Sequence, residues 1–251
     1  MTNTVEYLDT HAYWETVSDY DQQVVSIFVT ENAVTEALRD FPDKPGVTVA
    51  DFGCGVGNSF KHLREFRRVY AVDASSNMLE QAKAQLEDNV ELVKGKIEDT
   101  RLPEKCGLTL GLASVMPESI DHFHVLMDNL VQNTLEDGTI MLFLPSLESR
   151  TFAFQTYVDI MVEEGRSQED IYAEISNDIQ RYQFNPLGFM LTDQGTMQKA
   201  WLYEEIKYRL AGYGFSSIDI KKFEWDWEKQ IKKTKYAEYP KHWGWFVVIK
   251  R

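Results

Sequence analysis

Three glycines at alternate positions, Gly53, Gly55 and Gly57, follow Asp51 and a short apolar run in the stretch VADFGCGVGNSF. Glycine admits positive φ angles and lets a ligand approach the backbone closely, so such a loop can present its N–H groups to a nucleotide-like molecule. The dinucleotide fingerprint is G-x-G-x-x-G, and Asn58 stands where its third glycine belongs. No G-K-[ST] follows, which excludes a P-loop. The spacing therefore disfavours a dinucleotide.

A second candidate binding group is Asp73, which ends the next apolar run after the glycine loop. A carboxylate at this place can accept hydrogen bonds from both hydroxyls of a ribose. The alternative is that Asp73 only caps the helix that follows it. Because the glycine loop and the acid fall at the ends of consecutive predicted strands, we favour the ribose interpretation.

These groups must be positioned by a parallel sheet, because apolar segments of strand length alternate with helical patterns. The predicted strands are 47–53, 69–75, 90–95, 108–115 and 139–146, and the predicted helices are 58–66, 76–87 and 120–135. Ser76 or Asn77 is expected to cap the second helix. The acidic turn Glu136-Asp137-Gly138 should end the third one. A helix at 201–212 and two runs, 216–225 and 243–251, close the chain, and these runs predict an antiparallel pair at the sheet edge.

Two regions depart from this alternation, although we expect residues 1–251 to form a single domain. Residues 1–42 predict a helical lid, whose aromatic side chains either pack on the sheet or cover a ligand. Residues 147–199 contain no convincing strand and predict a cap insertion of two or three helices, with a turn at NPLG. Most of the aromatic side chains in this insertion are expected to hold it on the sheet.

Composition restricts the partners that this chain can have. Its net charge of −14 disfavours nucleic acid, which usually meets a basic face. No apolar run is long enough to cross a bilayer, and the first residues do not resemble a signal peptide. The only cysteines, Cys54 and Cys106, exclude a four-cysteine zinc site. We therefore expect a cytoplasmic protein with a small-molecule substrate, no membrane partner and no metal.

Several segments together resemble the class I S-adenosylmethionine-dependent methyltransferases. They are DFGCGVG (51–57), AVDASSNML (71–79), GKIEDTRLP (95–103) and LEDGTIMLFLPS (135–146). The resemblance implies an α/β, Rossmann-like fold with a seven-stranded, mostly parallel sheet whose sixth and seventh strands form an antiparallel hairpin. It also implies S-adenosyl-L-methionine as cofactor. The family's frequent G-D-A is replaced by Gly95-Lys96-Ile97, and N-P-P-[YF] is absent after the fourth strand, which disfavours a nucleic-acid base as acceptor.

The resemblance also implies roles for individual residues. The loop Gly53–Gly57, including Cys54, would lie against the methionine and ribose, and Asp51 would organise this loop. Asp73 would bind the ribose hydroxyls. The residues expected around the adenine are Ala74, Met78, Ile97 and Glu98, and those expected at the methionine end are Ala113 and Ser114.

The methyl acceptor is expected to be a hydroxyl or an amine of a small molecule, which a general base would help to deprotonate. Candidates for that base are Tyr20, His11 and Glu118, with His122 and His124 as further histidines near the same sheet edge. The residues expected to contact the substrate are Tyr13, Trp14, Tyr20 and Met116. Two alternatives stay open: a non-catalytic S-adenosylmethionine-binding scaffold or sensor, and a NAD-dependent oxidoreductase, which the glycine spacing disfavours.

Overall fold

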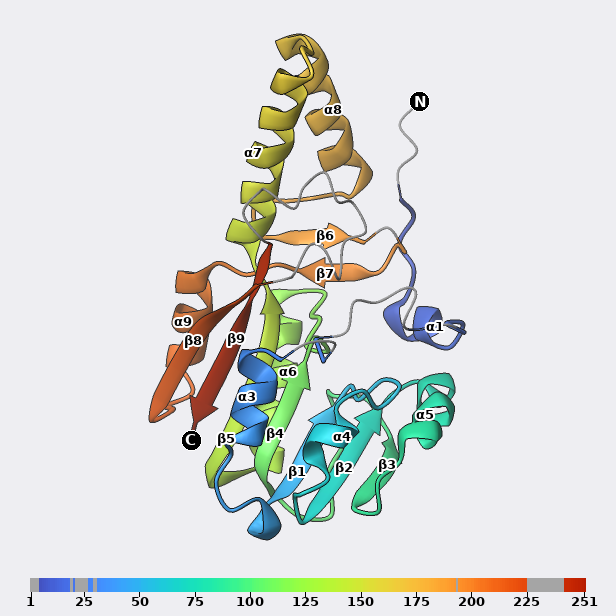
Figure 1. Cartoon of the computed structure of the whole chain (residues 1–251), viewed down its shortest axis with the longest axis vertical. Coiled ribbons are helices and arrows are strands. Elements are labelled where there is room, and N and C mark those ends of the chain that lie inside the picture. The colour runs from blue at the N-terminus through green and yellow to red at the C-terminus, as the bar shows by residue number, and fades with distance from the viewer. Residues whose placement is uncertain (1–4, 19, 21–26, 29–30, 193, 225–241) are drawn as a thin grey trace.

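Seven strands form the central sheet of the computed structural model, which describes residues 5–18, 20, 27–28, 31–192, 194–224 and 242–251 (Figure 1). The strands are β1 (Thr48–Phe52), β2 (Arg68–Asp73), β3 (Val90–Lys94), β4 (Cys106–Leu112), β5 (Thr134–Pro145), β8 (Ser217–Glu224) and β9 (Trp243–Lys250). Their order is β3-β2-β1-β4-β5-β9-β8, with β9 and β8 antiparallel to their neighbours and the rest parallel. The predicted fold class, including the terminal hairpin, is confirmed.

Helices cover both faces of this sheet. The helices are α3 (Ala33–Arg39), α4 (Phe60–Leu63), α5 (Ser76–Ala82), α6 (Ile120–Asn133) and α9 (Tyr203–Ala211), with short 3₁₀ turns at Lys44–Gly46 and Lys83–Gln85. Helices α6 and α9 pack on one core cluster, and α3 and α4 pack on the other. Neighbouring residues of β1 alternate between the two clusters, Val49 in one and Ala50 in the other. Burial on both faces explains the continuous apolar runs of the parallel strands.

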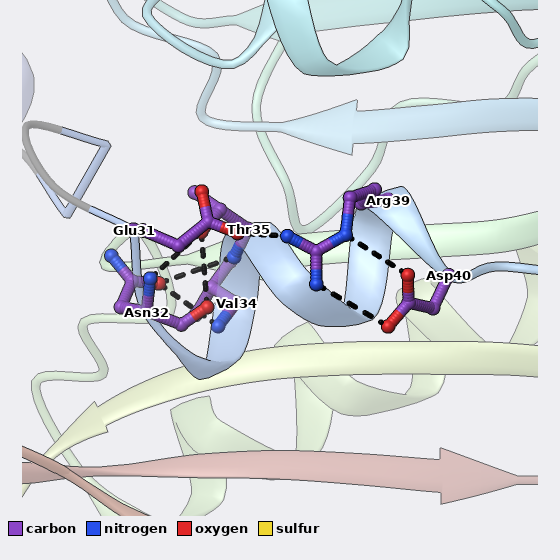
Figure 2. A network of polar contacts seen from close by, with 6 residues as sticks. All are labelled: Glu31, Asn32, Val34, Thr35, Arg39 and Asp40. Atoms are coloured by element: carbon purple, nitrogen blue, oxygen red, sulfur yellow. Dashed lines mark hydrogen bonds and ion pairs between the residues drawn. The ribbon is translucent and has the colours of Figure 1, made fainter.

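Helix α3 begins with a reciprocal capping arrangement (Figure 2). The Asn32 side chain accepts hydrogen bonds from the backbone N–H groups of Val34 and Thr35, and the Thr35 hydroxyl accepts one from the Asn32 N–H. At the other end, Arg39 pairs with Glu31 and Asp40. The capping hydrogen bonds satisfy backbone N–H groups that a helix start leaves without partners, and so they stabilise this short helix.

The predicted turn at residues 136–138 is wrong. Strand β5 already begins at Thr134, directly after α6, and continues through Glu136, Asp137 and Gly138. The Thr134 hydroxyl bonds to the Leu130 carbonyl and to Thr109, and Thr134 pairs with Cys106 of β4. A register shift between Cys106 and Leu108 accommodates the extra residues. Residues 135–138 fall between the paired residues Thr134 and Thr139, so they supply the extra length of β5 at this irregularity. Similarly, Ser75, not Ser76 or Asn77, caps α5.

The cap insertion is not purely helical, which corrects the prediction for residues 147–199. Helices α7 (Leu147–Glu163) and α8 (Gln168–Arg181) form an arm that projects from the body of the molecule (Figure 1). They are followed by β6 (Phe189–Leu191) and β7 (Met197–Lys199), an antiparallel pair between this arm and the sheet. Each strand has three residues, too few to show an alternating pattern.

A buried ion pair joins this hairpin to the sheet domain. The Lys199 side chain is fully buried, and its Nζ donates to Glu205 Oε2 at 2.9 Å and to the Ala200 carbonyl at 2.7 Å. The ammonium also lies 4.3 Å from the centre of the Trp201 ring. Because a buried charge needs such partners, these contacts define where β7 meets α9.

The amino-terminal region is helical only in part. Helix α1 (Thr10–Trp14) lines the cavity and α3 packs on the sheet, whereas residues 5–9 are not helical and run beside the cap (Figure 1). The Val5 N–H donates to the Arg181 carbonyl, and the Leu8 N–H donates to that of Gly195. Residues 1–4, 19, 21–26 and 29–30 lie outside the described part of the chain. None of the helices in the described part could cross a membrane.

Candidate functional site

A cavity of about 570 Å³ lies at the carboxyl ends of the parallel strands. This edge is where open α/β sheets bind their ligands. The structure brings together at this cavity most of the residues predicted from the sequence: His11, Tyr13, Trp14, Tyr20, Gly53, Gly55, Asp73, Ala74, Met78, Ile97, Glu98, Ala113, Ser114, Met116 and Glu118. Three predicted residues, Asp51, Cys54 and Gly57, lie outside its lining. The Cys54 thiol is buried, and burial raises its pKa well above its ordinary value.

The glycine loop has the backbone conformation that its sequence predicts. Gly53, Gly55 and Gly57 have φ angles of 74°, 55° and 87°. A Cβ on Gly53 would lie 2.2 Å from the Cβ of Ser114, whose hydroxyl donates to the Phe52 carbonyl at 2.6 Å. The ends of β1 and β4 thus pack so closely that only glycine fits between them.

Asp73 is held by two backbone donors. Its Oδ2 accepts from the Gly55 N–H and its Oδ1 from the Ser75 N–H, both at 2.9 Å. Burial raises the pKa of this carboxyl, and the two hydrogen bonds partly offset that effect. Each carboxylate oxygen keeps a further lone pair, so Asp73 can still accept two hydrogen bonds from a ligand in the cavity.

Asp51 lies beneath the loop and not in the cavity wall. Its carboxylate is buried and accepts a hydrogen bond from the Ser59 hydroxyl at 2.5 Å. Burial raises the pKa of Asp51 from its ordinary 3.8 to about 6, and the nearby charge of Asp73 adds to this effect. The carboxylate therefore organises the loop at a cost in stability when it is ionised.

This cost predicts a pH dependence of stability. Because the pKa of Asp51 is higher in the folded than in the unfolded protein, folding takes up a proton between about pH 4 and pH 6. The contribution of Asp51 to the free energy of unfolding should fall by about 3 kcal/mol as the pH rises through this window. Urea denaturation of the wild type and of Asp51→Asn at several pH values would measure it. Asp51→Asn should lack this pH-dependent part of the free energy of unfolding. Superimposable pH profiles of the variant and the wild type would contradict the raised pKa of Asp51.

The candidate bases lie on the cavity wall, but their hydrogen bonds differ. Glu118 accepts from the Tyr7 hydroxyl at 2.7 Å, which raises the pKa of Tyr7 to about 12. Tyr20 lies over the loop, with its Cε2 3.7 Å from where a Cβ on Gly55 would be. His11 also lines the cavity.

Two further histidines near this sheet edge have hydrogen-bond partners of their own. His122 Nδ1 accepts from the Glu118 N–H at 3.2 Å, which fixes the tautomer with a proton on Nε2, and that nitrogen lies 3.2 Å from Glu98 Oε1. His124 pairs with the Tyr213 hydroxyl at 2.9 Å and is not among the lining residues.

The residues of one wall of the cavity were not predicted from the sequence. It comes from the end of β5 and the first turn of α7 (Ser146, Ser149 and Arg150), from the β6–β7 hairpin (Thr192, Gln194 and Thr196–Gln198) and from the start of β9 (His242, Trp243 and Gly244). Ser146 could have been found, because it follows a predicted parallel strand. The hairpin residues could not, since the strands that carry them were not predicted.

The sequence also matches known proteins. Residues 49–127 match the family described as "Methyltransferase domain". An uncharacterized methyltransferase of Geobacillus sp. (strain WCH70) is 26% identical over 208 residues, which cover 78% of this chain and 93% of the relative. The matched segment contains the glycine loop, which follows β1, and Asp73, which ends β2. These matches and the geometry of the site support a class I S-adenosylmethionine-dependent methyltransferase.

Solved structures share the fold of this methyltransferase. One is magnesium protoporphyrin IX methyltransferase from Synechocystis PCC 6803 with bound S-adenosylmethionine, with a TM-score of 0.58, 14% identity and coverage of 97% of this chain and 98% of that one. Another is DhpI in complex with S-adenosylhomocysteine, with a TM-score of 0.57, 15% identity and coverage of 95% and 93%. At these identities the likeness concerns the fold.

S-adenosylmethionine is the cofactor of the methyltransferase, and the cavity fits it. A ribose needs acceptors for its two hydroxyls, which the partly buried Asp73 can supply. The positive φ angles of Gly53 and Gly55 expose backbone to the cavity at the end of β1. An adenine needs a flat apolar surface, and Met78 and Ile97 line the same space.

Proposed function

We propose that this methyltransferase transfers a methyl group from S-adenosylmethionine to a hydroxyl or amine of a small molecule in the described cavity. The observation that carries this proposal is the enclosure of the sheet edge by α1, the β6–β7 hairpin and the start of β9. A cavity of about 570 Å³ is in the range of small-molecule sites. The net charge of −14 supports the exclusion of nucleic acid. Two free thiols support a cytoplasmic location.

We propose that the residues at the ends of β1, β2 and β4 bind the cofactor. Asp73 accepts the ribose hydroxyls, and the backbone of Gly53 and Gly55 faces the ribose and methionine. The adenine is surrounded by Ala74, Met78, Ile97 and Glu98, and the methionine end lies at Ala113 and Ser114. When bound, the cofactor supplies an electrophilic methyl on a sulfonium, so the chain itself has to align the acceptor, exclude water and take up a proton.

The proton can go to His11 or Glu118. Both line the cavity, and an imidazole or a carboxylate is a stronger base than a tyrosine phenol. Tyr20, whose ring lies over the glycine loop, is then placed to orient the acceptor together with Tyr13, Trp14 and Met116.

The proposed function is tested with the purified protein and S-adenosylmethionine labelled in its methyl group. A library of small hydroxylated and amine-bearing molecules should contain acceptors that take up the label, whereas RNA and protein should not. Crystals grown with S-adenosylhomocysteine should show its sulfur facing His11, Tyr20 and Glu118. Cofactor binding without transfer to any member of the library would favour the scaffold alternative instead.

A further inference from the structure

Arg150 is a cation in the cavity wall that lacks an acidic partner. It lies in the first turn of α7, and one guanidinium nitrogen donates to the Gln198 side chain in β7. Its Nε is buried and has no hydrogen-bond partner among the residues that the structure describes. No carboxylate of this described part pairs with it either. Buried cations without a counter-charge are costly, so this residue requires an explanation.

Among the described residues, none compensates the charge of Arg150. Burial lowers the pKa of the guanidinium, and no nearby carboxylate counteracts that shift. The neighbouring His242 has a pKa below its ordinary value, first because of burial and second because of the charge of Arg150. The acids that line the cavity are Asp73, Glu98 and Glu118, and each has other hydrogen-bond partners.

Arg150 is also distant from the cofactor residues in the sheet order. Asp73 ends β2, and Arg150 follows β5, which is separated from β2 by β1 and β4. Three strand spacings correspond to roughly 14 Å. The cofactor can therefore lie at β2, β1 and β4 while a second molecule occupies the space at β5 and β9.

We propose that the Arg150 end of the cavity binds an oxyanion, a carboxylate or a phosphoryl group, carried by the methyl acceptor. This inference rests on the proposed function. A bound oxyanion would provide the charge that no described side chain supplies, and a guanidinium matches the geometry of either group. Another donor on the same wall is the hydroxyl of Ser149, which accepts a hydrogen bond from the Trp243 N–H and keeps its own proton to donate. The acceptor class is thus a small hydroxylated or amine-bearing acid.

The test uses the full-length protein saturated with S-adenosylhomocysteine. Calorimetry is carried out with a panel of small aromatic and aliphatic carboxylates and phosphate monoesters, each paired with its neutral amide or alcohol. Each acid should bind at least about tenfold more tightly than its neutral partner. Comparison of the carboxylates with the phosphate monoesters shows which oxyanion is preferred. Arg150→Met should abolish this preference, and Arg150→Lys should retain part of it.

The matched control is Arg166→Met, because Arg166 pairs with Glu174 at 2.6 Å outside the cavity lining. It should keep the full preference for acids. Equal binding of acids and neutral partners, no binding of any acid, or an unchanged preference in Arg150→Met would overturn the proposal. Failure to bind S-adenosylhomocysteine would instead refute the proposed function, whereas Arg150→Met should bind it normally.

Discussion

Replacing Gly53 with alanine is expected to destabilise the methyltransferase by about 4 kcal/mol and to remove measurable cofactor binding. Two physical terms contribute. The new Cβ would lie 2.2 Å from the Ser114 Cβ, so β1 and β4 would have to separate at the cavity. The φ angle of 74° adds strain for any residue with a side chain. Urea denaturation and calorimetry with S-adenosylhomocysteine would measure the two effects.

The chain offers a control that separates the clash from the strain. Gly165, which follows α7, has a φ of 76°, but a Cβ there would meet nothing within 4 Å. Gly165→Ala should therefore cost only about 1 kcal/mol and leave cofactor affinity unchanged. Adding Ser114→Gly to Gly53→Ala should recover the part of the loss that comes from the clash. Equal costs for the two alanine variants would show that the close approach of β1 and β4 is unimportant.

Replacing Asp73 with alanine is expected to weaken the binding of S-adenosylhomocysteine by at least about tenfold, or 1.4 kcal/mol. The carboxylate is the group proposed to accept both ribose hydroxyls, and it also holds the Gly55 and Ser75 N–H groups at 2.9 Å. Its loss removes the ligand acceptors and loosens the loop together. Asp73→Asn keeps one acceptor oxygen and should bind more tightly than the alanine variant.

The matched control for Asp73 is Glu15→Gln. Glu15 accepts from the Ser76 and Asn77 N–H groups, and its charge acts on Asp73, but it does not line the cavity. This variant should change cofactor affinity by no more than about twofold. If Asp73→Ala folds normally and keeps the wild-type affinity, the ribose assignment is wrong.

The half of the cavity that we propose to bind the cofactor was predictable, because the signals that indicate it are local in the sequence. A loop of positive φ angles needs glycine at Gly53, Gly55 and Gly57, and strand ends in a parallel sheet meet at one edge, so Asp73 had to lie beside them. The same rule brought Glu98 and Ser114 to this edge. Near-continuous apolar runs similarly revealed the strands, since both faces of the sheet are covered.

Local patterns were insufficient where pairing partners lie far apart. Residues 136–138 have turn chemistry, yet they lie within β5, because the residues on either side of them, Thr134 and Thr139, both pair with β4. The three-residue strands β6 and β7 have too few positions for a periodic signal, and Lys199 becomes a buried residue only through Glu205. Contacts between distant segments supply these energies.

From the sequence by itself, the resemblance of its motifs predicted the family and the cofactor. The strand ends and the glycine loop predicted the sheet edge proposed to bind that cofactor, because glycine conformation and strand ends are short-range properties. Only the tertiary structure decided which residues form the cavity wall at β5 and β9. It placed Arg150, Gln198 and His242, which come from three separate elements, on one cavity wall. It also left Arg150 without an acidic partner among the described residues, because burial and pairing depend on where distant segments meet.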